Sequence, residues 1–95
     1  MPTKEDTIEM LKKVEDPELG LDIWTLGLIY TIDIKESHLK IKMTFTSPMC
    51  PYGPMLLDMV REGGIKAGFE SVEVEITFDP IWKPSDEVKM LLGIA

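Results

Sequence analysis

LIYTIDIKESHLKIKMTF, from Leu28 to Phe45, alternates apolar and polar residues on both sides of a short polar break. Alternation with a period of two is typical of strands that bury one face. A loop at Glu36 and Ser37 would pair the two strands with all their apolar side chains on one side, as a correct register requires. The predicted pairs are Ile34 with Leu39, Ile32 with Ile41, Tyr30 with Met43 and Leu28 with Phe45. Because Glu-Ser lacks the glycine or asparagine of a tight hairpin turn, a longer loop stays open.

A helical pattern precedes this hairpin. The hydroxyl of Thr3 can cap the first turn, and Ile8, Leu11 and Val14 form an apolar stripe at helical spacing. The helix is expected to end near Val14 or Glu15, because a proline at position 17 disfavours helical backbone in the residue before it.

A second helical pattern follows the hairpin, from Met55 to Ala67, and Gly68 is its expected C-terminal stop. The expected buried residues of this helix are Leu56, Met59, Val60 and Ile65. Two adjacent glycines, Gly63 and Gly64, weaken it by about 1 kcal/mol each relative to alanine.

The last third of the chain predicts one strand and one short helix. The strand has Val72, Val74, Ile76 and Phe78 on its inner face. Ser85 can cap the final helix. The element order is therefore α-β-β-α-β-α, which predicts an α+β fold: a two-layer sandwich of a three-stranded sheet with helices on one face.

Composition limits the classes of function. A chain of 95 residues predicts a single domain, residues 1–95. The net charge of -7 argues against nucleic-acid binding and against docking on an anionic membrane. No apolar run approaches the roughly 20 residues that span a bilayer. A single cysteine cannot form an internal disulfide, which favours a cytoplasmic location.

That cysteine, Cys50, lies in TFTSPMCPYGP, residues 44–54, where the alternating pattern gives way to the second helix. A helix N-terminus stabilises a thiolate and lowers the pKa of a thiol, and Pro48 and Pro51 stiffen the backbone around it. A reactive thiol is one interpretation. The other is an incidental or buried cysteine that only packs.

Two acids, a histidine and a tryptophan are further candidates for a functional role. In EDPELG, residues 15–20, Asp16 and Glu18 fit a capped helical turn, or else present carboxylates to the thiol as ligands, bases or partner contacts. His38, at the far end of the hairpin, is expected to be a solvated turn residue and not the base of a Cys–His pair. Trp82 is expected to cover the core, with an exposed partner anchor as the alternative.

Three motifs in order carry a resemblance that covers essentially the whole chain: DPELGLDIWTLGLIY, TFTSPMCP and DPIW. Together they resemble the metal–sulfur cluster biosynthetic family, which includes the SufT-type proteins, the phenylacetate-degradation protein PaaD and the eukaryotic cytosolic iron–sulfur assembly component. The family pattern is matched at these residues: Asp16, Pro17, Glu18, Leu26, Gly27, Leu28, Thr46, Ser47, Cys50, Pro51, Pro80 and Trp82. The chain departs from the pattern in its proline-rich PYGP, in Gly63-Gly64 and in a short segment after Trp82.

The resemblance implies a fold similar to the C-terminal domain of NifU-type scaffolds and a non-enzymatic role in iron–sulfur cluster maturation. It implies a cluster-handling site at Cys50, as the metal ligand, with Asp16, Glu18, Thr46 and Ser47 around it. The implied partners are a P-loop ATPase cluster carrier and apo iron–sulfur clients. A transient iron–sulfur cluster or iron is the implied cofactor.

One thiolate is too few for a cluster that usually takes four ligands. The missing ligands would come from a second copy of the chain in a homodimer, from a partner's cysteines, from a small thiol or from the two acids. Two other interpretations stay open: a metal-free adaptor that recruits client and ATPase, and a cysteine-dependent enzyme with Asp16 or Glu18 as base. A PaaD-like role in ring-hydroxylase maturation would be one form of the iron–sulfur cluster maturation role.

Overall fold

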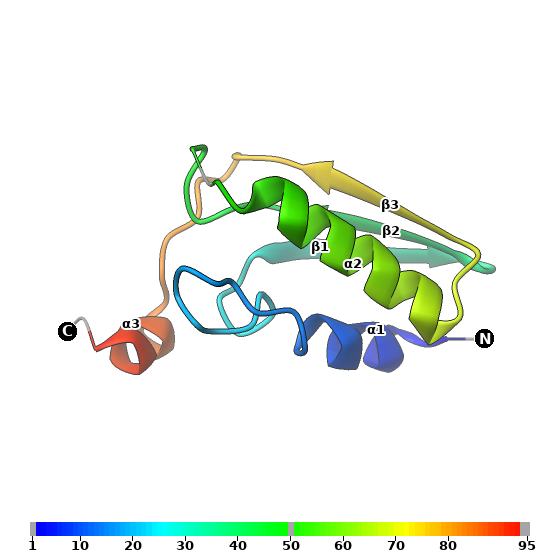
Figure 1. Cartoon of the computed structure of the whole chain (residues 1–95), viewed down its shortest axis with the longest axis horizontal. Coiled ribbons are helices and arrows are strands. Elements are labelled where there is room, and N and C mark those ends of the chain that lie inside the picture. The colour runs from blue at the N-terminus through cyan, green and yellow to red at the C-terminus, as the bar shows by residue number, and fades with distance from the viewer. Residues whose placement is uncertain (1, 50, 94–95) are drawn as a thin grey trace.

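The computed structural model describes residues 2–49 and 51–93. Its elements follow the predicted order and are α1 (Lys4–Leu11), β1 (Ile29–Lys35), β2 (His38–Met43), α2 (Gly53–Ala67), β3 (Ser71–Ile76) and α3 (Asp86–Leu92). The three strands form one mixed sheet in the order β1-β2-β3, with β1 antiparallel and β3 parallel to β2. Figure 1 shows α1 and α2 layered on the sheet and α3 at the far end from the N-terminus. The α+β prediction is confirmed.

The hairpin register is correct at its closed end and wrong at its open end. Ile34 pairs with Leu39 and Ile32 with Ile41, as predicted. An irregularity between Ile29 and Thr31 then places Ile29, and not Tyr30, opposite Met43. A bulge of this kind inserts one unpaired residue and turns its side chain away from the expected position.

Two hydrogen bonds accompany this shift. The displaced Tyr30 donates its hydroxyl to the carbonyl oxygen of Pro80 at 2.7 Å. Leu28 accepts from the amide of Thr44 at 2.9 Å, so it faces Thr44 and not Phe45. Because of the bulge, Tyr30 has no partner on β2 and instead contacts the C-terminal tail.

The hairpin loop contains only Glu36 and Ser37, because Lys35 pairs with His38. Glu36 takes a left-handed conformation with φ of 55°. The carbonyl of Ser37 accepts from the amide of Glu70 at 2.8 Å, so the segment before β3 braces the turn. This tertiary contact lets a two-residue loop form without glycine or asparagine.

The core lies between the sheet and a layer made of α1, α2 and the segment that follows α1, and its centre is formed by β2 and α2. The three inward side chains of β2, Leu39, Ile41 and Met43, are fully buried, as are Leu56 and Val60 of α2. The α2 positions against the sheet repeat at four-residue spacing, which explains why Ile65 is 51% exposed instead of buried as predicted. Each residue turns by about 100° around a helix, so Ile65 follows the buried position 64 and faces outward.

The two glycines of α2 allow close packing on both sides. A Cβ on Gly63 would lie 2.7 Å from the Met10 side chain, and one on Gly64 would lie 2.5 Å from Cγ2 of Val72. The helix therefore tolerates two poor helix formers because they permit α1 and β3 to approach it.

The helix ends are mostly as expected. Thr3 forms a capping box with Asp6, the hydroxyl of Ser85 accepts from the amide of Val88, and Gly68 ends α2 with φ of 115°. The end of α1 differs: it stops at Leu11, because the amides of Lys13 and Val14 bond to the carbonyls three residues back, those of Met10 and Leu11, and not to those four residues back. The strand β3 likewise ends at Ile76, so Phe78 lies beyond it.

Gly64→Ala should destabilise the fold, and Gly63→Ala should change it little. Overpacking costs about 1–3 kcal/mol, which outweighs the gain of about 1 kcal/mol from better helix propensity. At Gly64 the added methyl meets the stiff, branched Val72 on the sheet, whereas at Gly63 it meets Cγ and Sδ of the unbranched, flexible Met10 side chain. Urea unfolding of both variants checks this, and equal stability of the two would contradict the packing argument.

Candidate functional site

Three segments meet at one end of the sheet: residues 12–28, residues 44–52 and the tail 77–85 (Figure 1). The amide of Thr44 binds the carbonyl of Leu28, and the amide of Thr77 binds the carbonyl of Met43, both at 2.9 Å. Trp82 donates its indole Nε1 to the carbonyl oxygen of Leu26 at 2.6 Å. The tail thus holds the first two segments together from outside, and the predicted covering role of Trp82 is confirmed.

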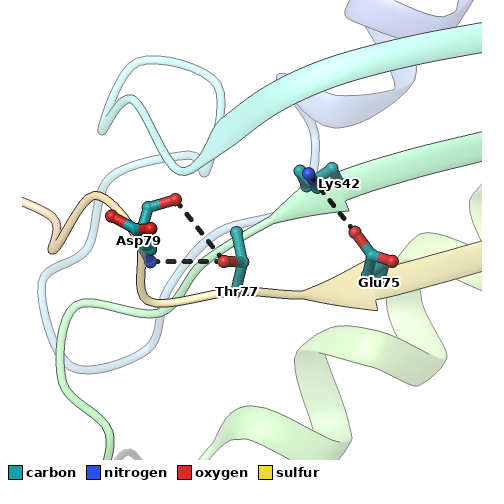
Figure 2. A network of polar contacts seen from close by, with 4 residues as sticks. All are labelled: Lys42, Glu75, Thr77 and Asp79. Atoms are coloured by element: carbon teal, nitrogen blue, oxygen red, sulfur yellow. Dashed lines mark hydrogen bonds and ion pairs between the residues drawn. The ribbon is translucent and has the colours of Figure 1, made fainter.

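The tail turns sharply where it leaves β3. The amide of Asp79 donates to the hydroxyl of Thr77 at 3.2 Å, and that hydroxyl also lies 3.5 Å from the Asp79 carbonyl (Figure 2). Pro80 follows through a cis peptide bond, and its carbonyl receives the hydroxyl of Tyr30. The turn directs Trp82 back over the 12–28 segment.

Asp16 organises a closed turn in the first segment. Its Oδ1 accepts from the amides of Glu18 at 2.8 Å and Leu19 at 3.3 Å. Its own amide binds the carbonyl of Leu21, and its carbonyl receives the amide of Gly20. The capped-turn interpretation of this acid is therefore confirmed.

The same carboxylate has a second oxygen that the turn does not use. Asp16 is fully buried, and its Oδ2 has no hydrogen-bond partner among the residues that the structure describes. Leaving a buried polar atom unpaired costs about 1–3 kcal/mol or more, so such an atom is a candidate for contact with a further group. Glu18 is exposed and offers its carboxylate to solvent.

The 44–52 segment is anchored at its base and exposed at its tip. The ring of Phe45 lies against Gly53, where a Cβ would approach it to 2.9 Å, and its centroid is 6.3 Å from that of Phe78. Thr46 is half-buried, and Ser47 is exposed. The predicted reactive residue, Cys50, lies outside the described residues.

The start of α2 borders this segment. Pro54 is in the first turn, as expected for a residue without an amide hydrogen, and no described side chain caps the helix. Around it three apolar side chains are exposed: Met49 at 86%, Tyr52 and Met55. These three side chains thus expose apolar surface beside the first turn of α2.

Four of the predicted site residues, Asp16, Glu18, Thr46 and Ser47, are in segments that share this end of the molecule, but they form no bonded cluster. Among residues 2–49 and 51–93, no hydrogen bond joins Asp16 or Glu18 to Thr46 or Ser47; the Ser47 hydroxyl instead accepts from the amide of Met49 at 3.2 Å. Within the same residues, no three His, Cys, Asp or Glu side chains are grouped to hold a metal ion. No helix in the described part of the chain is long and apolar enough to cross a membrane.

His38 lies at the opposite end of the sheet. It is the first residue of β2, is exposed, and places its Nδ1 2.6 Å from the hydroxyl oxygen of Ser71. Sequence reasoning missed the packing of Phe45 on Gly53 and the contact of Tyr30 with Pro80. The first had a partial signal, a glycine at position 53, just before the helix that was expected from Met55.

The fold and the arrangement of these motifs define an iron–sulfur cluster assembly protein, and the chain belongs to that family, whose model matches residues 4–77. Its relatives include the Fe-S protein maturation auxiliary factor YitW of Bacillus subtilis, 41% identical over 96% of this chain and 94% of that protein. The Fe-S protein maturation auxiliary factor SufT of Staphylococcus aureus is 36% identical over 86% of this chain and 99% of that protein. Among solved structures, the conserved hypothetical protein TM0487 from Thermotoga maritima superimposes with a TM-score of 0.83 and 47% identity, covering 96% and 94% of the two chains.

Asp16→Ala should lower the free energy of unfolding by about 1–2 kcal/mol, since it removes the acceptor of two amides. Asp16→Asn should cost much less, because the amide oxygen can replace Oδ1. Thermal or urea unfolding measures both. A loss in the asparagine variant as large as that in the alanine variant would show that the turn depends on the carboxylate charge and not on the cap.

Proposed function

We propose that this protein is an iron–sulfur protein maturation factor that helps transfer clusters to client proteins through the segment containing Cys50. Membership of the iron–sulfur cluster assembly family carries the proposal. Two relatives that match most of this chain are named as Fe-S protein maturation auxiliary factors, which supports it.

The single thiol of each chain supports a transient role for the cluster, which here is cargo. Cys50 supplies one thiolate, and a cluster usually takes four ligands. Asp16, with its unused Oδ2, and the exposed Glu18 are proposed as nearby acids, and Thr46 and Ser47 as nearby hydroxyls. Remaining ligands would come from the client, the ATPase carrier or a second copy of the chain. Weak holding by one chain suits delivery better than storage.

An adaptor function is the second candidate, and a specific observation favours it. Met49 and Tyr52 of the 44–52 segment, and Met55 directly after it, expose apolar surface. Exposed apolar groups of this kind are typical of protein contact sites, and methionine adapts to varied partners. In this reading the protein brings the P-loop ATPase carrier and the apo-client together and binds no cluster itself.

Cys50→Ser should abolish cluster transfer to an apo iron–sulfur enzyme while leaving the fold intact. Serine keeps the size of the side chain but is a poor ligand for iron. The measurement is recovery of client activity and of cluster absorbance under anaerobic conditions, with far-UV circular dichroism as the folding control. Full client maturation by this variant would rule out the thiol's role. Retained co-purification of client and ATPase alongside full maturation would favour the adaptor.

Asp16→Asn should slow client maturation more than Asp22→Asn does. Both aspartates cap a turn in the same segment, since Oδ2 of Asp22 accepts from the amide of Thr25 at 2.8 Å. Only Asp16 combines a capping oxygen with a fully buried, unpartnered one, and asparagine changes that second atom while keeping the cap. The rate of client maturation by the two variants, at matched folded fractions, is the test. Equal rates would remove Asp16 from the site.

A further inference from the structure

The outer edge of β3 is open. The strand is last in the sheet order, and no backbone hydrogen bond from its outer side is formed within the described part of the chain. In a parallel pair, alternate residues direct their N–H and C=O groups away from the partner strand. Figure 1 shows β3 as the outer strand, with no described element beyond it. These groups form a ready template for another strand.

The strand also lacks most of the features by which proteins usually close an edge, and its two glutamates are its only charged side chains. Its sequence, SVEVEI, contains no proline, glycine or lysine. Its register with β2 runs unbroken from the pair His38–Ser71 to the pair Met43–Ile76, without a bulge. Prolines, bulges and lysines are the common means of preventing edge pairing. The edge of β3 is therefore regular over six residues.

Charge on the outer face of the sheet indicates what would bind there. Across the strands Asp33 faces Lys40, which faces Glu73, and Lys42 faces Glu75. Figure 2 shows Lys42 directed at Glu75, with Nζ and Oε2 3.5 Å apart. Lysines of β2 thus lie on only one side of the β3 glutamates, and a basic strand beyond β3 would repeat the favourable pairing.

The inner, apolar face of β3 is also partly exposed to solvent. Its apolar side chains are Val72, Val74 and Ile76, and all three are only half-buried. Their neighbours on the central strand are fully buried. An added strand with apolar residues at alternate positions would cover the rest of this face.

A second copy of the chain is a poor occupant. In antiparallel pairing of two β3 strands, every register that keeps the valines on the inner face and pairs more than three of the six residues sets Glu73 opposite a glutamate of the other copy. Like charges directly opposite each other destabilise a strand pair. Repulsion between glutamates therefore disfavours a dimer formed by pairing two β3 strands.

We infer that the open edge of β3 binds an extended segment of a partner protein in which lysine or arginine alternates with apolar residues, and that this segment adds to the sheet as a fourth strand. This mode of recognition takes affinity from main-chain hydrogen bonds and specificity from alternate side chains. The inference concerns the sheet edge and does not depend on cluster transfer.

The test uses the full-length chain, labelled with ¹⁵N, and a seven-residue peptide of alternating lysine and valine. Amide chemical shifts and hydrogen exchange are followed during titration. The peptide should shift and protect amides of β3. Two control peptides should bind at least about tenfold more weakly: one with glutamate in place of lysine, and one N-methylated at alternate amides, which cannot pair along an edge.

Glu73→Gln with Glu75→Gln should weaken binding of the lysine peptide about tenfold. The matched control, Asp33→Asn with Glu36→Gln, changes the net charge equally, from -7 by two to -5, but at the other side of the sheet and its hairpin turn, and should bind normally. Circular dichroism confirms that both variants fold. Glutamine retains the length of glutamate, so the variant removes the charge pairing with Lys40 and Lys42 and leaves the backbone edge in place.

Several outcomes overturn the inference. Equal binding of the N-methylated peptide, or equal weakening by both double variants, would show unspecific charge attraction. Shifts confined to residues outside β3 would place the site elsewhere. Failure of the lysine peptide to bind, or self-association of the free protein through β3, would also exclude it.

Discussion

The burial of β2 under α2 is the interaction on which the rest of the structure depends. Leu39, Ile41 and Met43 point into the core, and the strand is paired along both edges, so β2 has no freedom to shift. The carbonyl of Met43 accepts from the amide of Thr77 at the start of the tail. The amide of Thr44, the residue after the strand, donates to the carbonyl of Leu28 at the end of the 12–28 segment. Every segment of the candidate site is therefore attached, directly or by one hydrogen bond, to the end of this strand. The rigid sheet thus positions all three segments.

Much of this architecture follows from local pattern. Alternation from position 28 to 45 predicted two strands and the correct pairing of Ile32 and Ile34, because a one-residue slip would expose the whole apolar face. The bulge at Ile29–Thr31 could not be predicted in the same way, since it depends on a tail residue fifty positions away that receives the Tyr30 hydroxyl. The glycine pair of α2 was interpreted as a weakness for a similar reason. Its purpose is set by Met10 and Val72, which only the tertiary structure brings near.

In the candidate site too, local features were predictable and features that depend on tertiary packing were not. Asp16 in its DPE turn was predicted as a cap from spacing alone, because caps are local. Its complete burial and its unpartnered Oδ2 were not predictable, since they result from the packing of the whole 12–28 segment. The bond between Trp82 and the carbonyl of Leu26 joins residues 56 apart, and no pattern in the sequence pairs them. Proximity of the motifs was inferred from family resemblance; the structure places their described parts at one end of the sheet.

The polarity of the sheet relates the open edge to that end. Because β3 runs parallel to β2, both strands finish where the 44–52 and 77–85 segments begin. A strand added along β3 would therefore have one terminus beside these segments, whichever direction it took. A partner held by its backbone along six residues would need no strong contact with the loops to bring the rest of its chain close to them. Such an arrangement would separate the surface that gives affinity from the segment that is proposed to perform transfer. Met49 and Tyr52 could then stay exposed, free to meet a client.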